Sequence, residues 1–188
     1  MTPWVLLPVK DFARAKTRLA PLFDGPARAE AARQMFLHVL SVVTRAGLPT
    51  LVVTDGDAPA KLARAHGAQV LTDPPDAARL GDVVDAGLGH LGARGAHDVL
   101  VLMSDLPQLT AADLEAMLAP GAQSVAAPDE AEAGTNALRV RLTGRQPTAF
   151  GRADSFARHV ALGAAPVRRP GLARDVDLPD HARRWLPR

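Results

Sequence analysis

The stretch VLVLMSDLP, residues 99–107, places an acid just beyond the most apolar run of the chain. Val99–Met103 has the length and composition of a buried strand, and Asp105 follows it by two residues. Further strands are predicted at 4–8, 50–54 and 69–71, and helices at 27–47, 58–66, 80–93 and 111–118. Alternating strands and helices predict an α/β fold, in which a mainly parallel sheet is covered by helices on both faces.

The ends of the predicted strands indicate where a ligand would bind. In open parallel sheets this is outside the carboxyl ends of the strands, so the loops after Val9, Thr54 and Met103 should share one functional rim. The region Ser124–Arg141 is strand-like and interrupted by an acidic loop. We interpret it as an added hairpin or small subdomain that carries a second substrate. With 188 residues and no linker, one domain over 1–188 is expected.

The composition argues against several classes of protein. A net charge of +2 with 4% aromatic residues gives little support to a nucleic-acid partner. The apolar runs are too short to span a bilayer, so no membrane partner is expected. The chain starts almost at once with a strand and shows no basic and apolar leader, which favours a cytoplasmic protein. Because there are no cysteines, any metal site must use oxygen or imidazole ligands.

Basic residues crowd into PVKDFARAKTRL, residues 8–19, directly after the first predicted strand. Lys10, Lys16 and Arg18, with Arg14 among them, could hold a triphosphate through ammonium and guanidinium contacts. The glycines of a P-loop are absent. The alternative is a solvated helix face whose apolar residues turn inward, and the position after the first strand favours the phosphate interpretation.

Three aspartates form the candidate metal site. Asp105 would be held rigidly at the rim, although Asp-Leu-Pro is also an ordinary turn sequence. Asp175 and Asp177 alternate in ARDVDLPDH, so on an extended segment both carboxylates would face one side and could address one ion. The alternative for Asp177 is capping of a short helix that begins near Pro179.

Two further motifs, GTNAL (134–138) and FGRADSFARH (150–159), are candidate anion sites. Thr135 and Asn136 are expected on a loop, where they offer backbone N–H groups, a hydroxyl and an amide. Ser155 is expected to begin a short helix, whose N-terminus presents unpaired N–H groups. The alternatives are a turn for the first motif and a helix cap for the second. His159 lies one helical turn after Ser155 and is predicted to share its face.

Taken in order along the chain, these motifs resemble the 2-phospho-L-lactate guanylyltransferase family, which acts in coenzyme F-420 biosynthesis. The matching segments are PVKDFARAKTRL, VLMSDLPQL, GTNAL, FGRADSFARH and RDVDLPD, spread from Val9 to Asp180. The resemblance implies a Rossmann-like nucleotidyltransferase fold of the GT-A type. It further implies transfer of GMP from GTP to 2-phospho-L-lactate, phosphoenolpyruvate or 3-phospho-D-glycerate, with release of pyrophosphate.

The resemblance also implies roles for individual residues. Asp105, Asp175 and Asp177 would bind Mg²⁺, and Lys10, Lys16 and Arg18 would act with Asp105 on the triphosphate of GTP. The acid substrate would be held by residues of the two anion motifs, namely Thr135, Asn136, Gly151 and Ser155. Asp82, in LGDVVDAG, occupies the place of an asparagine that relatives commonly carry, which changes a contact on the nucleotide side.

Other activities stay open from the sequence. One is a nucleotidyltransferase of the same fold that uses a sugar phosphate or molybdopterin, and another is a catalytically silent nucleotide-binding regulator. The presence of three candidate metal ligands, Asp105, Asp175 and Asp177, argues against the regulator, because a protein that only binds a nucleotide does not need a metal beside the α-phosphate. A homodimer is one alternative for the oligomeric state.

Overall fold

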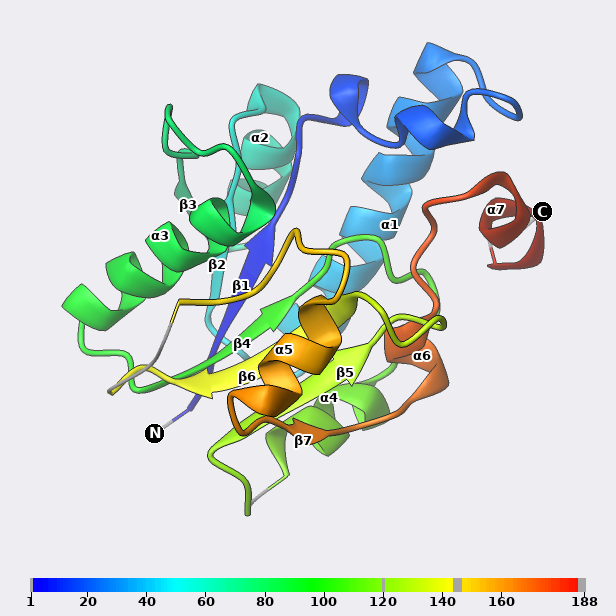
Figure 1. Cartoon of the computed structure of the whole chain (residues 1–188). Coiled ribbons are helices and arrows are strands. Elements are labelled where there is room, and N and C mark those ends of the chain that lie inside the picture. The colour runs from blue at the N-terminus through cyan, green and yellow to red at the C-terminus, as the bar shows by residue number, and fades with distance from the viewer. Residues whose placement is uncertain (1, 120, 144–146, 186–188) are drawn as a thin grey trace.

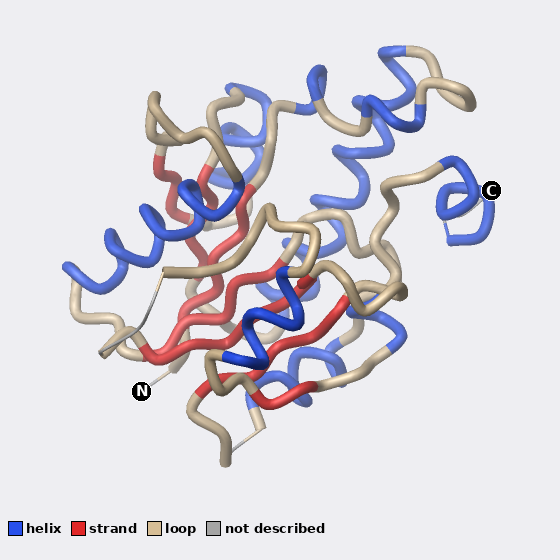
Figure 2. The backbone as a smooth tube through the Cα atoms, in the orientation of Figure 1, coloured by secondary structure: helices blue, strands red, loops and turns tan. Residues whose placement is uncertain are grey.

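The computed structural model of the chain describes residues 2–119, 121–143 and 147–185. Within these residues, seven strands form one sheet in the order β3-β2-β1-β4-β6-β5-β7 (Figures 1 and 2). The strands are β1 (Trp4–Pro8), β2 (Thr50–Val53), β3 (Gln69–Leu71), β4 (Asp98–Leu102), β5 (Ser124–Pro128), β6 (Thr135–Arg141) and β7 (Ala165–Pro166). The predicted α/β fold with a mainly parallel sheet is confirmed.

The neighbouring strands β1 and β4 mark the point where the strand order reverses. From β1 the chain builds outward through β2 and β3, all three parallel, whereas β4 pairs with the opposite edge of β1. Residues that follow β1 and residues that follow β4 line one crevice at this edge of the sheet. In α/β sheets of this kind, ligands bind at such a switch point.

The predicted hairpin is present, and its strands belong to the main sheet. Strand β6 pairs antiparallel with both β4 and β5, with Ala137 opposite Leu102. Because β6 runs against β4, its first residues lie beside the carboxyl end of β4. The backbone N–H of Met103 donates to the carbonyl of Asn136 at 2.9 Å, which fixes this arrangement.

Helices cover both faces of the sheet. They are α1 (Gly25–Arg45), α2 (Asp57–Ala65), α3 (Leu80–Ala93), α4 (Ala111–Leu118), α5 (Ser155–Ala161), α6 (Pro170–Ala173) and α7 (Pro179–Trp185). Helices α1, α2 and α4 contribute to one core, and α3 and α5 to the other; the latter two lie in front of the sheet in Figure 1. Two short 3-10 helices, η1 (Phe12–Arg14) and η2 (Thr17–Leu19), follow β1 and were not predicted.

The two cores explain the apolar runs in the sequence. Alternate residues of a strand face opposite sides, so Leu100 and Leu102 enter the core beneath α1, while Val99 and Val101 enter the core beneath α3. All four side chains are fully buried. A strand buried on both faces needs apolar residues at every position, and this is why the run is continuous rather than alternating.

A third apolar cluster positions the C-terminal segment. Trp185 and Ala182 of α7 pack with Val176, with Leu19 of η2 and with Met35 of α1. This packing holds the loop between α6 and α7 beside the loop that follows β1. The longest helix of the described ranges, α1, lacks the continuous apolar surface that a membrane crossing requires, as do the other helices described.

Candidate active site

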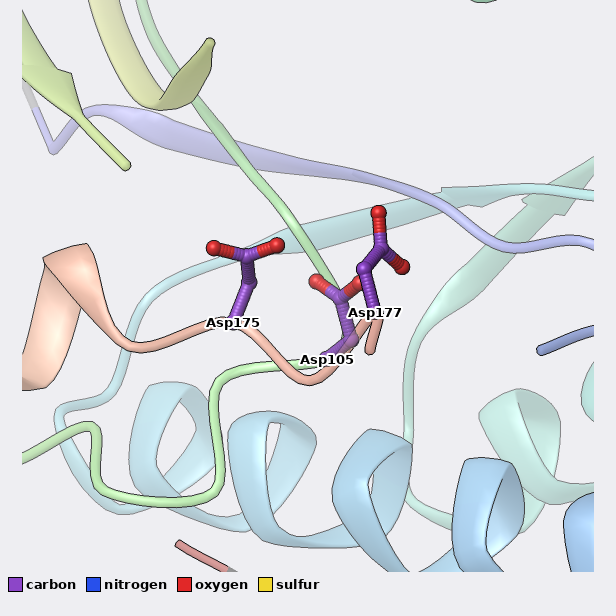
Figure 3. A group of neighbouring side chains, drawn as sticks. All are labelled: Asp105, Asp175 and Asp177. Atoms are coloured by element: carbon purple, nitrogen blue, oxygen red, sulfur yellow. The ribbon is translucent and has the colours of Figure 1, made fainter. Parts of the chain in front are cut away.

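Three carboxylates meet at the rim beside the switch point. Asp105 lies just beyond β4, and Asp175 and Asp177 lie on the loop that precedes α7 (Figure 3). One carboxylate oxygen from each lies within 4.8 Å of the others. The backbone joins the two loops as well, because the N–H of Val176 donates to the carbonyl of Asp105 at 3.2 Å. The sequence therefore predicted correctly that these three residues lie together.

Lys16 supplies a positive charge within this cluster. Its Nζ donates to Oδ2 of Asp105, and to Oδ1 of Asp177 at 2.8 Å. Burial lowers the pKa of Lys16, but the two carboxylates outweigh burial, so its pKa lies above the ordinary value. The backbone of Lys16 has a left-handed φ of 54°, which is uncommon outside glycine.

Asp175 differs from its neighbours because it has no direct cation partner among the described residues. Burial, followed by the charge of Asp105, raises the pKa of Asp175 to about 6. The Nδ2 of Asn136 donates to Oδ1 of Asp175 at 3.0 Å and works against this rise. Asp177 shows the opposite result: burial raises its pKa, yet Lys16 holds the pKa below the ordinary value.

The donor set fits a divalent cation of the magnesium or manganese class. Such ions prefer carboxylate oxygens, and the three aspartates present several within reach of one point. The ammonium group of Lys16 already bridges two of the carboxylates, so this position favours positive charge. Asn136 fixes the orientation of Asp175, as a neighbour of a metal ligand commonly does.

A cleft of about 620 Å³ opens beside the carboxylates. Its wall includes Lys10, Lys16, Asp105 and Asp177, so the basic loop and two of the acids face one space. This volume lies within the usual range for small-molecule sites. Arg18 is not among the residues that line the cleft; its side chain is 74% exposed, and its guanidinium is 3.9 Å from the carboxylate of Asp177.

The residues predicted to hold the acid substrate lie away from the wall of this cleft. Thr135 and Ser155 are buried, with their hydroxyl oxygens 3.1 Å apart. The structure corrects one detail, because Thr135 and Asn136 are the first residues of β6 and not part of a loop. The sequence did not show that β6 returns antiparallel to β4 and carries them to the rim.

His159 fixes the hydrogen-bond directions in this buried group. Its Nε2 lies 2.9 Å from the backbone N–H of Ala149, which can only donate, so Nε2 accepts. A neutral ring then carries its proton on Nδ1 and donates to Oγ1 of Thr135, 2.9 Å away. The Thr135 hydroxyl also forms a hydrogen bond with the Ser155 hydroxyl, in which either oxygen can be the donor. Burial lowers the pKa of His159 to about 4, which keeps the ring neutral.

The remaining predicted residues lie where the segment after Phe150 meets the start of α3. Gly151 has a φ of 79°, and an added Cβ would lie 3.3 Å from the backbone nitrogen of Leu80, so a side chain there would be strained. Asp82 faces its own backbone: Oδ2 accepts from the N–H groups of Ala78 and Arg79, at 3.1 and 2.9 Å. Its carboxylate is thus engaged in starting the helix.

Sequence reasoning missed several groups at the site. It assigned no role to Asp55, whose carboxylate pairs with Arg14, or to Asp73, which lines the cleft. It also considered Asn136 only as a substrate contact and not as the partner of Asp175. The position of Asp55 and Asp73, just after β2 and β3, is a signal that could have identified them, since both strands end at the same rim.

Known proteins with similar sequences identify the family of this chain. Residues 3–166 match the family described as "Guanylyl transferase CofC like". A phosphoenolpyruvate guanylyltransferase from Conexibacter woesei is 36% identical over 193 residues, covering 96% of this chain and 85% of that protein.

Solved structures show the same fold at lower sequence identity. A protein assigned as a nucleotide-diphospho-sugar transferase from Desulfovibrio desulfuricans superposes with a TM-score of 0.79 and 18% identity, covering 95% of this chain and 84% of that one. Rv0371C from Mycobacterium tuberculosis, solved in complex with manganese, gives 0.56 and 19%, with 99% of both chains covered. With a nucleotidyltransferase fold, three clustered carboxylates and a family match over residues 3–166, this chain belongs to the CofC-like guanylyl transferases and is a nucleotidyltransferase.

Proposed function

We propose that this enzyme transfers GMP from GTP to a small phosphorylated carboxylic acid and releases pyrophosphate. The observation that carries the proposal is the group of Asp105, Asp175 and Asp177 with Lys16, at the switch point beside a nucleotide-sized cleft. The family supports guanylyl transfer. The relative from Conexibacter woesei makes phosphoenolpyruvate the first acceptor to test, ahead of 2-phospho-L-lactate and 3-phospho-D-glycerate. We place the reaction in coenzyme F-420 biosynthesis.

The reaction needs no general base. A phosphate monoester has its second pKa at about 6, so at neutral pH the acceptor phosphate is mostly dianionic and already nucleophilic. One of its oxygens attacks the α-phosphorus of GTP, a P–O–P bond forms, and the bond from the α-phosphorus to the bridging oxygen breaks. Pyrophosphate carries away that electron pair. His159, whose ring is buried and neutral, is therefore not required for proton transfer.

The main obstacle is the repulsion between two polyanions. We propose that Lys10, Lys16 and Arg18 address the triphosphate, and that Asp105, Asp175 and Asp177 hold Mg²⁺. When bound, the metal ion stabilises charge on the phosphate oxygens. Lys16 would contact both the triphosphate and the metal-binding carboxylates, because it lines the cleft and contacts two of the three carboxylates.

The acceptor is proposed to bind near Thr135, Asn136, Gly151 and Ser155. The two hydroxyls support this: the hydrogen bond between Thr135 and Ser155 uses one hydroxyl proton, so the other hydroxyl proton of the pair is left to donate to another group. An acid substrate would offer such an acceptor. Within one domain, this arrangement would put the acid on the β6 and α5 side and GTP on the β1 side.

Product mass spectrometry tests the proposal directly. Purified protein with Mg²⁺, GTP and each of the three acids should give one GMP–acid adduct and an equal amount of pyrophosphate. Parallel reactions with ATP, CTP and UTP test the nucleotide. If a sugar phosphate or molybdopterin is guanylylated in place of every phosphorylated acid, the acceptor assignment is wrong.

A further inference from the structure

The carboxylates that line the cleft differ in whether they have a partner. Among the described residues, four aspartates contribute to its wall: Asp55, Asp73, Asp105 and Asp177. Asp105 and Asp177 contact Lys16, and Asp55 pairs with Arg14. Asp73 has no ion pair among the described contacts, and its Oδ1 is a buried oxygen without a hydrogen-bond partner.

A buried carboxylate oxygen is stable only when a hydrogen-bond donor contacts it. Leaving such an atom unsatisfied destabilises a fold, so oxygens of this kind are usually paired with a protein group, a water or a ligand. Burial and the neighbouring charge of Asp55 both raise the pKa of Asp73, since neither favours its charged form. Asp73 also lines the cleft, so a ligand there that brings N–H groups to its carboxylate would relieve both effects.

The position of Asp73 relative to the candidate metal site suits the far end of a nucleotide. Asp73 follows β3, and Asp105 follows β4, with β2 and β1 between them. Three strand spacings separate these ends by about 14 Å. A nucleotide whose α-phosphate lies beside Asp105 would therefore extend its base along the rim toward Asp73.

The wall beside Asp73 is suited to the flat face of a base. Pro74, Pro75 and Ala77 line the cleft next to it, and the two prolines have no backbone N–H. Asp82 begins a helix through its own backbone contacts, so its carboxylate is already occupied. In this part of the cleft, the carboxylate of Asp73 is the acidic group left without a partner in the described structure.

We propose that Asp73 selects guanine by accepting the N1–H and the 2-amino group of the base. Guanine places these two donors side by side, which matches the two oxygens of a carboxylate. Adenine presents an unprotonated N1 at the same place, and a carboxylate would repel it. The inference rests on the proposed use of GTP and adds the residue that distinguishes GTP from other nucleotides.

Equilibrium binding without an acceptor tests this role. Isothermal titration calorimetry with Mg²⁺ would compare GTP, ITP and XTP on the wild-type protein and on Asp73→Asn. ITP lacks the 2-amino group, and XTP carries a carbonyl there. Wild type should bind GTP about 10-fold more tightly than ITP and at least about 100-fold more tightly than XTP. Asp73→Asn should bind XTP at least as tightly as GTP, because the amide can donate to the xanthine carbonyl.

Asp76→Asn is the matched control, because Asp76 is an exposed acid on the same loop that does not line the cleft. It should keep the wild-type order of affinities, and circular dichroism should show an intact fold for both variants. The inference is overturned if Asp73→Asn still prefers GTP to XTP. It is equally overturned if wild type binds ITP as tightly as GTP, a result that needs no variant.

The same proteins separate this inference from the proposed function. If wild type selects GTP through Asp73 but forms no GMP adduct with any phosphorylated acid, the proposed acceptor is wrong and the role of Asp73 stands. If adducts form while selection for GTP is unchanged in Asp73→Asn, the proposed reaction stands and Asp73 does not read the base.

Discussion

Acidification should destabilise this protein through His159. The ring is 3% exposed, and its Nε2 accepts from the backbone N–H of Ala149. Protonation would place a second proton against that N–H and remove the bond. The folded pKa of about 4 lies below the ordinary histidine pKa of 6.5, so the stabilisation is fully present above pH 6.5 and is lost as the pH falls toward 4. The lowering of the pKa from 6.5 to about 4 corresponds to about 3 kcal/mol of unfolding free energy, most of which is lost by pH 4.5.

Urea unfolding of wild type and His159→Gln, measured between pH 7 and pH 4.5, isolates this contribution. Other groups titrate in the same range, among them Asp175 with a pKa of about 6, but they are common to both proteins. The difference in unfolding free energy between the two proteins should change by about 2 to 3 kcal/mol in favour of the variant. His97→Gln, at an exposed histidine, should follow wild type. Parallel curves for wild type and His159→Gln would refute the argument that burial keeps this ring neutral.

Three further predictions concern the candidate site. Asp105→Asn should keep the fold, as measured by circular dichroism, but reduce turnover by more than about 100-fold, and near-normal turnover would exclude a metal role for Asp105. Asn136→Ala removes the amide that orients Asp175, so the apparent Kd for Mg²⁺ should rise about 10- to 100-fold in a calorimetric titration. Ser155→Ala should raise KM for the acid about 10-fold, with KM for GTP unchanged. A rise confined to KM for GTP would mean that the two substrates are assigned to the wrong ends of the site.

Much of the fold follows from local patterns in the sequence. Val99–Met103 was predicted as a strand because a continuous apolar run of that length is typical of a buried strand. The observed strand β4 spans Asp98–Leu102. Helix α4 begins after Thr110 as predicted, since the Thr110 hydroxyl accepts from the N–H of Asp113 and the Asp113 carboxylate accepts from the N–H of Thr110. Signals of this kind act over a few residues and can be read directly.

The site was only partly predictable, because its contacts join distant parts of the chain. The alternation of Asp175 and Asp177 indicated a shared face, and the strand before Asp105 indicated the rim. The hydrogen bond from Asn136 to Asp175 depends on the antiparallel return of β6, which no local pattern encodes. Asp73 is likewise notable only for a missing partner, a property of the packed structure.

The contact between Lys16 and Asp177 bridges 161 positions along the chain. Synthesis proceeds from the N-terminus, and early segments can begin to fold while later ones are still being made. A nascent chain that has not yet reached Asp175 carries the β1–β4 crevice and Asp105 but lacks two of the three carboxylates. We therefore expect ribosome-bound intermediates to be catalytically silent, with activity appearing only after the α7 segment docks against η2.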